Sequence, residues 1–360
     1  MKKEKIVLGM SGGVDSSVAA VLLQKDDYDV HGVFMKNWDD KHAICSAEDD
    51  YVDALSVCKK LNIPLKKIDY TNQYKDKVFK QFLEDHVHGL TPNPDILCNK
   101  EIKFEVFKNY AREIGAKKIA TGHYADTYDD NSTCFLKKAT DLSKDQSYFL
   151  HQLGQPELKD AVFPLGKIFK KDVRIIAKQY ALINHNKKDS TGICFIGERK
   201  FKDFLEQYLP AKPGSIQNSI GETLGTHAGL MFYTYGQRQG LGIGGVKNKA
   251  DAPWYVVDKD LAQNLLIVAQ GNENEDLYST KLLASIPSWI NKNVPLLPLS
   301  CTAKIRYRQS DQNCQVQLFS DTQIEVVFDQ PQRAVTPGQY IVFYHEDRCL
   351  GGAIIELFFR

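Results

Sequence analysis

Two cysteines of this chain have charged neighbours that could activate them. Cys98 lies in TPNPDILCNKEIKF (residues 91–104), three residues after Asp95 and close to Lys100 and Lys103. If a helical turn starts here, Asp95 and Cys98 share one face, the carboxylate can exchange a proton with the thiol, and the lysines favour the thiolate. In the structural alternative, Asp95 caps a helix and Cys98 is buried in its first turn. The segment alone leaves both interpretations open.

Cys194 is the second candidate. It follows Cys98 by 96 residues, in KKDSTGICFIGERKF (residues 187–201). Basic neighbours favour a thiolate, but an unreactive cysteine packed in a core as a small hydrophobe would fit the segment equally well. The basic neighbours are Lys187, Lys188, Arg199, Lys200 and Lys202.

A glycine- and serine-rich loop, GMSGGVDSS (residues 9–17), follows a predicted strand and opens a predicted helix. Free backbone amides at a helix start, together with the positive end of the helix dipole, suit a phosphate anion. The loop lacks the lysine of a Walker A motif. A plain strand-to-helix turn is the alternative, but the clustering of Ser, Gly and Asp after the first strand favours phosphate binding.

Alternating strands and helices must position these residues. Strands are predicted over residues 5–10, 30–38, 65–70 and 117–126, and helices over 14–25, 48–62, 74–89 and 103–116. This alternation predicts an α/β domain with a doubly wound parallel sheet. Such sheets bind ligands at the carboxyl ends of their strands, where the loop at residues 9–17 would lie.

The pattern changes near Pro210, Pro213 and Gly214, which mark a boundary. We therefore expect a catalytic domain over residues 1–208, a central β-rich domain over 209–277 and a C-terminal domain over 278–360. Alternating apolar residues over 301–309, 314–319, 323–328 and 339–359 predict an antiparallel β-barrel for the last of these.

Charge and composition limit the function classes. The formal net charge is +1, so a nucleic-acid partner would need local basic patches. Residues 166–180 offer Lys167, Lys170, Lys171, Arg174 and Lys178, although for any single lysine one solvated helix face is the better explanation. Residues 304–309 (KIRYRQ) mix cations with an aromatic ring, which suits RNA; outward charges on an ordinary strand are the alternative.

The chain shows no signal-peptide pattern and no apolar stretch near the roughly 20 residues of a membrane span. We therefore expect a cytoplasmic protein without stable disulfides. The cysteines also lack zinc-site spacing. We interpret the other six as structural or surface thiols: Cys45, Cys58, Cys134, Cys301, Cys314 and Cys349.

The loop SGGVDS resembles the SGGxDS loop of the PP-loop ATP pyrophosphatases, which adenylate a carbonyl oxygen of their substrate. Beyond this loop, the chain resembles the tRNA-specific 2-thiouridylase family in segments that run in family order from residue 9 to residue 344. The segments that carry the resemblance are GMSGGVDSSVAA, TPNPDILCNKEIKF, ATGHYAD, SKDQSYFL, KKDSTGICFIGERKF, GLMFYTYGQRQGLGIGG, PWYVVDKD, KIRYRQ and TPGQYIVFY.

The resemblance implies a PP-loop domain followed by two small β-rich domains, and it assigns roles to residues. Cys98 would be the nucleophile, Cys194 the persulfide carrier and Asp95 the general acid and base, while Asp15 would help to place Mg²⁺; no other residue is assigned to a metal. ATP would bind at Gly9, Met10, Ser11, Gly12, Gly13, Val14, Asp15, Ser16, Met35 and Gly122. The target base would contact Asn93, Pro94 and Asp95, and the rest of the tRNA would contact His123, Lys144, Asp145, Gln146, Arg306, Tyr307 and Gln339. Leu90 departs from the pattern, because the family often has Arg at this position.

The implied reaction adenylates the C2 oxygen of the wobble uridine in glutamate, glutamine and lysine tRNAs and then replaces it with sulfur. The sulfur would come from a cysteine desulfurase or a sulfur-relay protein, and a Cys98–Cys194 disulfide would form if Cys98 released the sulfur as sulfide. Direct attack by the persulfide is equally compatible. The alternatives are another adenylating enzyme acting on a small molecule, or a persulfide carrier or RNA-binding protein without catalysis.

Overall fold

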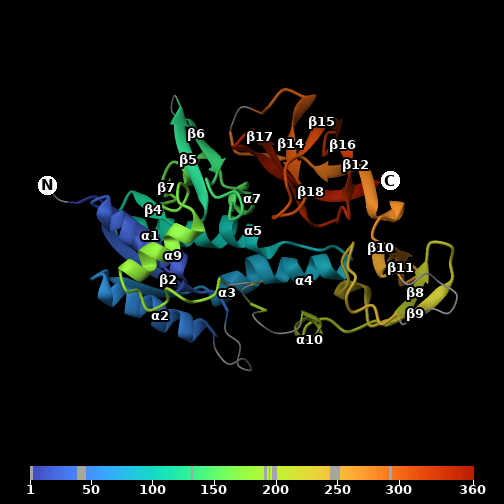
Figure 1. Cartoon of the computed structure of the whole chain (residues 1–360), viewed down its shortest axis with the longest axis horizontal. Coiled ribbons are helices and arrows are strands. Elements are labelled where there is room, and N and C mark those ends of the chain that lie inside the picture. Colours follow the sequence, from blue (N-terminus) through green and yellow to red (C-terminus); the bar gives the residue numbers. More distant parts are fainter. Residues whose placement is uncertain are drawn as a thin grey trace.

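The structure is a computed structural model that describes residues 3–38, 46–130, 133–189, 193, 195–196, 201–243, 252–291 and 294–360. Cys45 and Cys194 lie outside these residues. Figure 1 shows an N-terminal α/β part, a C-terminal barrel beside it and a smaller β-rich part that closes one end.

A parallel sheet forms the centre of the N-terminal part, in the order β3-β2-β1-β4-β7. Its order confirms the doubly wound α/β prediction, since strands are added on both sides of β1 (Figure 1). The strands are β1 (Lys5–Gly9), β2 (Asp29–Lys36), β3 (Leu65–Asp69), β4 (Lys118–Ala120) and β7 (Ala161–Val162).

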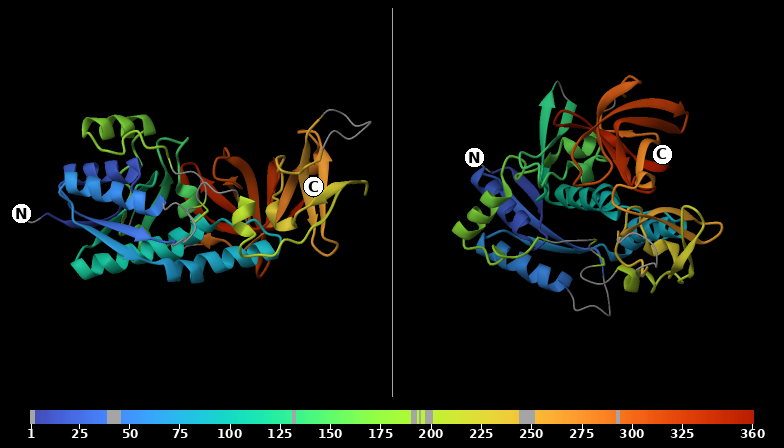
Figure 2. Two further views of the ribbon diagram at one scale, coloured as in Figure 1. Left: turned by 90° about the horizontal axis from the view of Figure 1, so that it is seen from below. Right: turned by 45° about the vertical axis from the view of Figure 1, so that its right-hand side comes forward.

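The central strand β1 is buried on both faces, because its apolar side chains alternate between two cores. Val7 of β1 belongs to one core, whereas Ile6 and Leu8 belong to the other. Helices α1, α2 and α9 pack on the face of Ile6 and Leu8, and α6 packs on the face of Val7 (Figure 2). The helices of this part are α1 (Val14–Lys25), α2 (Ser46–Lys60), α3 (Thr71–Tyr74), α4 (Lys80–Val87), α5 (Pro94–Cys98), α6 (Phe104–Ile114), α7 (Ser147–Leu150), α8 (Gln155–Leu158) and α9 (Lys170–Gln179).

Two predicted elements are interrupted. The strand expected over 117–126 is wrong as one element, because β4 ends at Ala120 and β5 (Ala125–Asp130) forms an antiparallel hairpin with β6 (Thr133–Lys138). The chain leaves the sheet here because Gly122 packs against the backbone of Ser16 in the loop after β1. The helix expected over 74–89 begins instead with a π-helical turn, η1 (Lys75–Phe79), before α4; a second such turn, η2 (Asn99–Lys103), joins α5 to α6.

The remaining chain forms two β-rich parts, as expected. A four-stranded sheet in the order β10-β11-β8-β9 is followed by a barrel that closes through the ring β12-β16-β15-β14-β17-β18-β12. The strand expected over 301–309 ends at Lys304, so Arg306 and Tyr307 lie in a turn rather than on a strand. The elements are α10 (Phe201–Leu205), β8 (Gly214–Asn218), β9 (Thr223–His227), η3 (Leu230–Phe232), β10 (Trp254–Asp260), β11 (Leu265–Gln270), η4 (Glu275–Leu277), β12 (Tyr278–Ser285), β13 (Ser288–Trp289), β14 (Leu299–Lys304), β15 (Gln312–Ser320), β16 (Gln323–Arg333), β17 (Tyr340–His345) and β18 (Arg348–Phe359).

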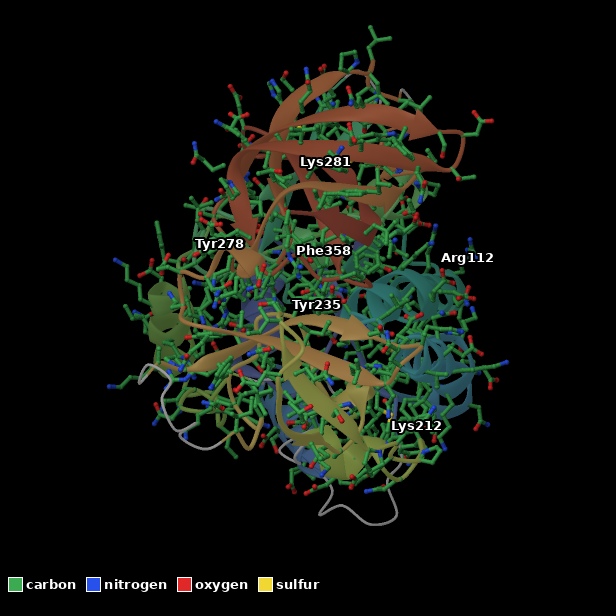
Figure 3. The ribbon with its side chains drawn as sticks, turned by 90° about the vertical axis from the view of Figure 1, so that its right-hand side faces the viewer. Arg112, Lys212, Tyr235, Tyr278, Lys281 and Phe358 are labelled. Atoms are coloured by element: carbon green, nitrogen blue, oxygen red, sulfur yellow. The ribbon has the colours of Figure 1, made fainter. Side chains whose placement is uncertain are left out.

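Side chains join these parts. The rings of Tyr235 and Phe358 meet edge to face between the central part and the barrel, with their centroids 5.3 Å apart (Figure 3). Lys259 Nζ donates to the carbonyl of Gly89, 3.0 Å away, and so ties the central part to the end of α4. No helix among the described residues is long and apolar enough to cross a membrane.

Candidate active site

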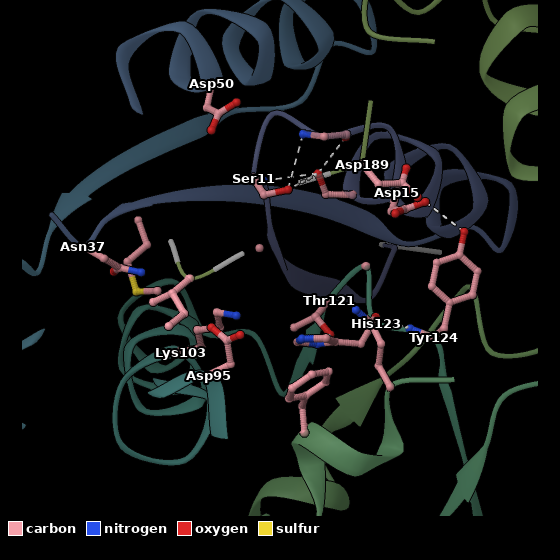
Figure 4. A pocket seen from close by; sticks show the side chains of 18 of the residues that line it. Ser11, Asp15, Asn37, Asp50, Asp95, Lys103, Thr121, His123, Tyr124 and Asp189 are labelled. Atoms are coloured by element: carbon pink, nitrogen blue, oxygen red, sulfur yellow. Dashed lines mark hydrogen bonds between the residues drawn. The ribbon is translucent and has the colours of Figure 1, made fainter. Parts of the chain in front are cut away.

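A cavity of about 910 Å³ opens at the carboxyl ends of β1, β2 and β4. Its walls include three regions far apart in sequence: the loop at residues 9–16, the loop and helical turn at 92–95, and the residues Tyr307, Arg308 and Gln339. Figure 4 shows the first of these regions above, and Asp95, Lys103 and His123 below it. The parallel sheet therefore places its open site where such folds bind ligands.

The loop after β1 is built to receive an anion. Gly12 has a φ of +77°, and a Cβ there would lie 2.2 Å from the carbonyl oxygen of Asp50, so only glycine fits. Gly13 precedes α1 without a capping side chain, which leaves the first amides of the helix available to a ligand. Ser16 Oγ donates to the carbonyl of Gly13 at 3.1 Å and accepts from the Ser11 amide at 3.2 Å, so the serines keep the loop in shape.

Most residues predicted to bind ATP belong to this loop or lie beside it. Gly122, from the end of β4, approaches so closely that a Cβ would lie 2.8 Å from the Ser16 amide nitrogen. Gly12 is the one predicted ATP residue that does not line the cavity, since its missing side chain faces Asp50. Those that line it are Gly9, Met10, Ser11, Gly13, Val14, Asp15, Ser16, Met35 and Gly122.

Asp15 is held by two groups. The Tyr124 hydroxyl donates to Asp15 Oδ1 at 2.9 Å, and Lys170 Nζ contacts both carboxylate oxygens at 2.7 and 2.8 Å. Burial, followed by the negative charge of Asp15, raises the pKa of Tyr124, so the phenol stays protonated and keeps donating. Figure 4 shows the hydrogen bond between Tyr124 and Asp15 as a dashed line.

The predicted helical turn at Asp95 is present as α5, with Pro94 at its first position. Asn93 occupies the N-cap position, so the interpretation of Asp95 as the cap is wrong, whereas Cys98 is buried in this turn as the same alternative expected. Burial raises the pKa of Asp95 and the Lys103 ammonium opposes that rise. Asp95 lines the cavity, whereas Cys98, 2% exposed, lies in the core behind it.

Seven residues are predicted to contact the tRNA outside its target base. Five of them line the cavity: His123, Lys144, Gln146, Tyr307 and Gln339. Gln339 Nε2 donates to the Thr91 carbonyl at 2.6 Å, which ties the barrel to the loop before α5. His123 Nδ1 lies 2.7 Å from Thr121 Oγ1, and burial, helped by Lys103, lowers the pKa of His123 to about 3. Asn93 and Pro94 line the cavity beside Asp95.

Two predicted tRNA residues lie elsewhere. Asp145 is 4% exposed and accepts hydrogen bonds from the Ala139 and Ser147 amides and from Ser147 Oγ. Arg306 donates to the carbonyls of Arg333 and Ala334 within the barrel. Contact with tRNA stays a prediction for both, and neither belongs to the cavity wall.

The other described cysteines lie away from the cavity wall. Burial raises the pKa of Cys58 to about 12. Burial is also the largest cause that raises the pKa of Cys134 to about 12. Cys301 and Cys314 face each other across β14 and β15 with their Sγ atoms 3.8 Å apart. Cys194 and Cys45 lie outside the described residues, although Ile193 lines the cavity.

Sequence reasoning missed several cavity residues, including Asp189 and Tyr124, and it placed Lys170 only in a general basic patch. Lys170 Nζ lies 2.8 Å from Asp189 Oδ1 as well as beside Asp15. Asp15, Lys170 and Asp189 come from separate parts of the chain, so no local motif joins them. A signal was available in the loop itself, since GMSGGVDSS holds no cation to offset a phosphate.

Comparison with known proteins identifies the family. Residues 4–198 match the model of the tRNA methyl transferase HUP domain, residues 202–270 the tRNA methyl transferase PRC-barrel domain and residues 279–355 the aminomethyltransferase beta-barrel domain. The chain is 53% identical over 359 residues to the tRNA-specific 2-thiouridylase MnmA of Marinomonas sp. (strain MWYL1), covering 99% of this chain and 92% of that protein. It is 54% identical over 360 residues to that of Legionella pneumophila (strain Lens), covering 99% of this chain and 100% of that protein. It is also 54% identical over 358 residues to that of Francisella philomiragia subsp. philomiragia, again covering 99% and 100%. This chain therefore belongs to the tRNA-specific 2-thiouridylase family.

Proposed function

We propose that this chain is an ATP-dependent tRNA 2-thiouridylase, which adenylates the C2 oxygen of the wobble uridine and replaces it with sulfur to give 2-thiouridine, AMP and pyrophosphate. One observation carries the proposal: a single cavity joins the anion-binding loop, the α5 turn with Asp95 and the barrel residue Gln339. Activation of a base by ATP requires the nucleotide and the base to meet in one site.

ATP would bind with its phosphates on the amides at the start of α1 and with its nucleoside near Met35 and Gly122. Mg²⁺ commonly uses one or two carboxylates together with substrate phosphates and water, and Asp15 offers one carboxylate at the loop. Among the described residues no group of three or more His, Cys, Asp or Glu side chains could hold a metal ion. This donor set fits a Mg²⁺ that arrives with ATP, and the ion would supply positive charge to the departing pyrophosphate.

The target uridine would lie against Asn93, Pro94 and Asp95. Burial favours a protonated Asp95, which is suited to donate to or accept from the base as charge develops. Cys98 lies one helical turn after Asp95 and is buried. In this proposal it reacts with a persulfide on Cys194, which lies outside the described residues. Sulfide release by Cys98 and direct attack by the persulfide both remain part of the proposal.

The tRNA would extend from the cavity over the barrel turn that carries Arg306 and Tyr307. The acceptors expected are glutamate, glutamine and lysine tRNAs, in the cytoplasm, with a cysteine desulfurase or a sulfur-relay protein as donor. His123 would meet the tRNA as a neutral imidazole, because its pKa lies near 3.

Pyrophosphate release tests the proposal against other adenylating enzymes. The chain is incubated with ATP and Mg²⁺, and with either bulk tRNA or a mixture of amino acids. Release that depends on tRNA supports the proposal, whereas release that depends on amino acids would assign a small-molecule substrate. Mass analysis of the tRNA nucleosides then distinguishes replacement of oxygen by sulfur from addition of a methyl group. Methyl transfer is the chemistry in the name of the family model, but not in the names of the full-length relatives.

A further inference from the structure

The basic run at residues 166–180 does not form one solvated surface. Lys171 is exposed, and the Lys167 side chain is 78% exposed. Lys170 is different, because its side chain is only 13% exposed and lines the cavity. It is the first residue of α9, and its backbone amide donates to Asp141 Oδ2 at 2.9 Å. Helix α9 therefore directs this one lysine toward the nucleotide loop.

Two carboxylates from distant segments hold the Lys170 ammonium. Both oxygens of Asp15, in the first turn of α1, lie 2.7 and 2.8 Å from Nζ, and Asp189 Oδ1 lies 2.8 Å away. Asp189 also pairs with Lys144 at 2.9 Å and with Arg174 at 2.9 Å. Figure 4 shows Asp189 and Asp15 next to each other at the start of α1.

The nucleotide loop lacks a cation of its own. A Walker A loop carries a lysine that reaches the β and γ phosphates, but GMSGGVDSS offers only amides, hydroxyls and the negative charge of Asp15. Lys170 supplies an ammonium at this place from a position 155 residues later. The carboxylates that hold it are partly exposed, at 31% for Asp15 and 34% for Asp189, so a ligand can reach them.

We propose that Lys170 is a phosphate-binding residue of the nucleotide site. Asp15 and Asp189 hold its ammonium beside the loop, and phosphate oxygens of ATP replace at least one of these carboxylates when the nucleotide binds. Charge-assisted contacts between ammonium and phosphate are among the stronger hydrogen bonds in proteins. The inference rests on the proposed ATP-dependent function and adds a binding residue to it.

Calorimetric titration of the full chain with ATP and Mg²⁺ tests this assignment. Lys170→Gln removes the charge, and we expect ATP to bind about tenfold more weakly, as for the loss of one charge-assisted contact. Lys171→Gln is the matched control, since it changes the adjacent lysine on the same helix and should bind ATP like the wild type. Affinity for tRNA, measured without ATP, should be equal in both variants.

Asp189→Asn separates the charge of Lys170 from the ion pair as a structural unit. This variant frees Lys170 from one competing carboxylate, so its ATP affinity should equal or exceed that of the wild type. ATP binding as weak as in Lys170→Gln would overturn the assignment, because the ion pair rather than the ammonium would then set the affinity. If Lys170→Gln bound ATP like the wild type, or lost only tRNA binding, the Lys170 assignment would be overturned while the proposed function would stand. A wild-type chain that bound no ATP would overturn it together with the proposed function.

Discussion

Gly122→Ala tests how closely β4 supports the nucleotide loop. An added Cβ would lie 2.8 Å from the Ser16 amide nitrogen and 3.1 Å from the Asp15 carbonyl carbon. Ordinary contacts begin at 3.4 Å, so the loop would have to move by about 0.6 Å (3.4 minus 2.8). Both neighbours are backbone atoms at the start of α1, and neither can step aside as a flexible side chain would. Since a 1 Å misplacement of a reacting group can cost about 10²-fold, we expect a loss of roughly tenfold in kcat/KM for ATP.

The assay for Gly122→Ala is tRNA-dependent pyrophosphate release at varied ATP. Gly225→Ala is the matched control, because a Cβ at Gly225 in β9 meets no atom within 4 Å. Circular dichroism melting of both variants checks that each is folded. If Gly122→Ala kept a kcat/KM within twofold of Gly225→Ala, the close approach of β4 would not position the loop, and this reasoning would be refuted.

Three further predictions follow from buried groups. Asp95→Asn should lower thiouridine formation by about 10²–10⁴-fold in single-turnover assays, as for a lost proton-transfer group. Thermal melting at pH 7 should show no loss of stability, because burial disfavours the charge of Asp95. Near wild-type turnover would argue against a catalytic role for Asp95. His86 and His151 are buried with pKa values lowered to about 4, chiefly by burial, so the unfolded chain takes up their protons first and stability should fall as the pH drops from about 6.5 toward 4. Urea unfolding should show a slope of about 1 kcal/mol per pH unit for each histidine in that range, and a flat profile would contradict the buried neutral state. Tyr124→Phe removes a hydrogen bond to Asp15 and should weaken ATP binding in calorimetry by roughly three- to tenfold, as for one lost bond to a charged group; unchanged ATP affinity would show that Tyr124 does not orient Asp15.

Local periodicity was enough to predict much of the N-terminal fold. The helix over residues 14–25 begins and ends as predicted, because its apolar residues and the glycine pair before it are all local signals. The strand over 117–126 could not be bounded in the same way. Its early end at Ala120 depends on the approach of Gly122 to Ser16, which is a tertiary contact.

The candidate site divides in the same manner. The nucleotide loop and the Asp95–Cys98 turn each lie within one short segment, so residue types and spacing pointed to them. The contacts of Asp15 with Lys170 and Tyr124 join residues 155 and 109 positions apart, and no pattern along the chain pairs them. The burial of Asp145 and the bonds of Arg306 to barrel carbonyls likewise depend on how distant strands pack.

The most direct test of the account is nucleoside analysis of tRNA after incubation of the chain with ATP, Mg²⁺ and a sulfide or persulfide source. The wild-type chain should produce 2-thiouridine only when ATP is present, and Cys98→Ala should produce none from the persulfide source. Cys58→Ala, which alters a buried cysteine away from the cavity, should retain activity if it folds. Thiouridine made at wild-type levels by Cys98→Ala, or without ATP, would contradict the central claim that this cavity activates a tRNA base for sulfur transfer.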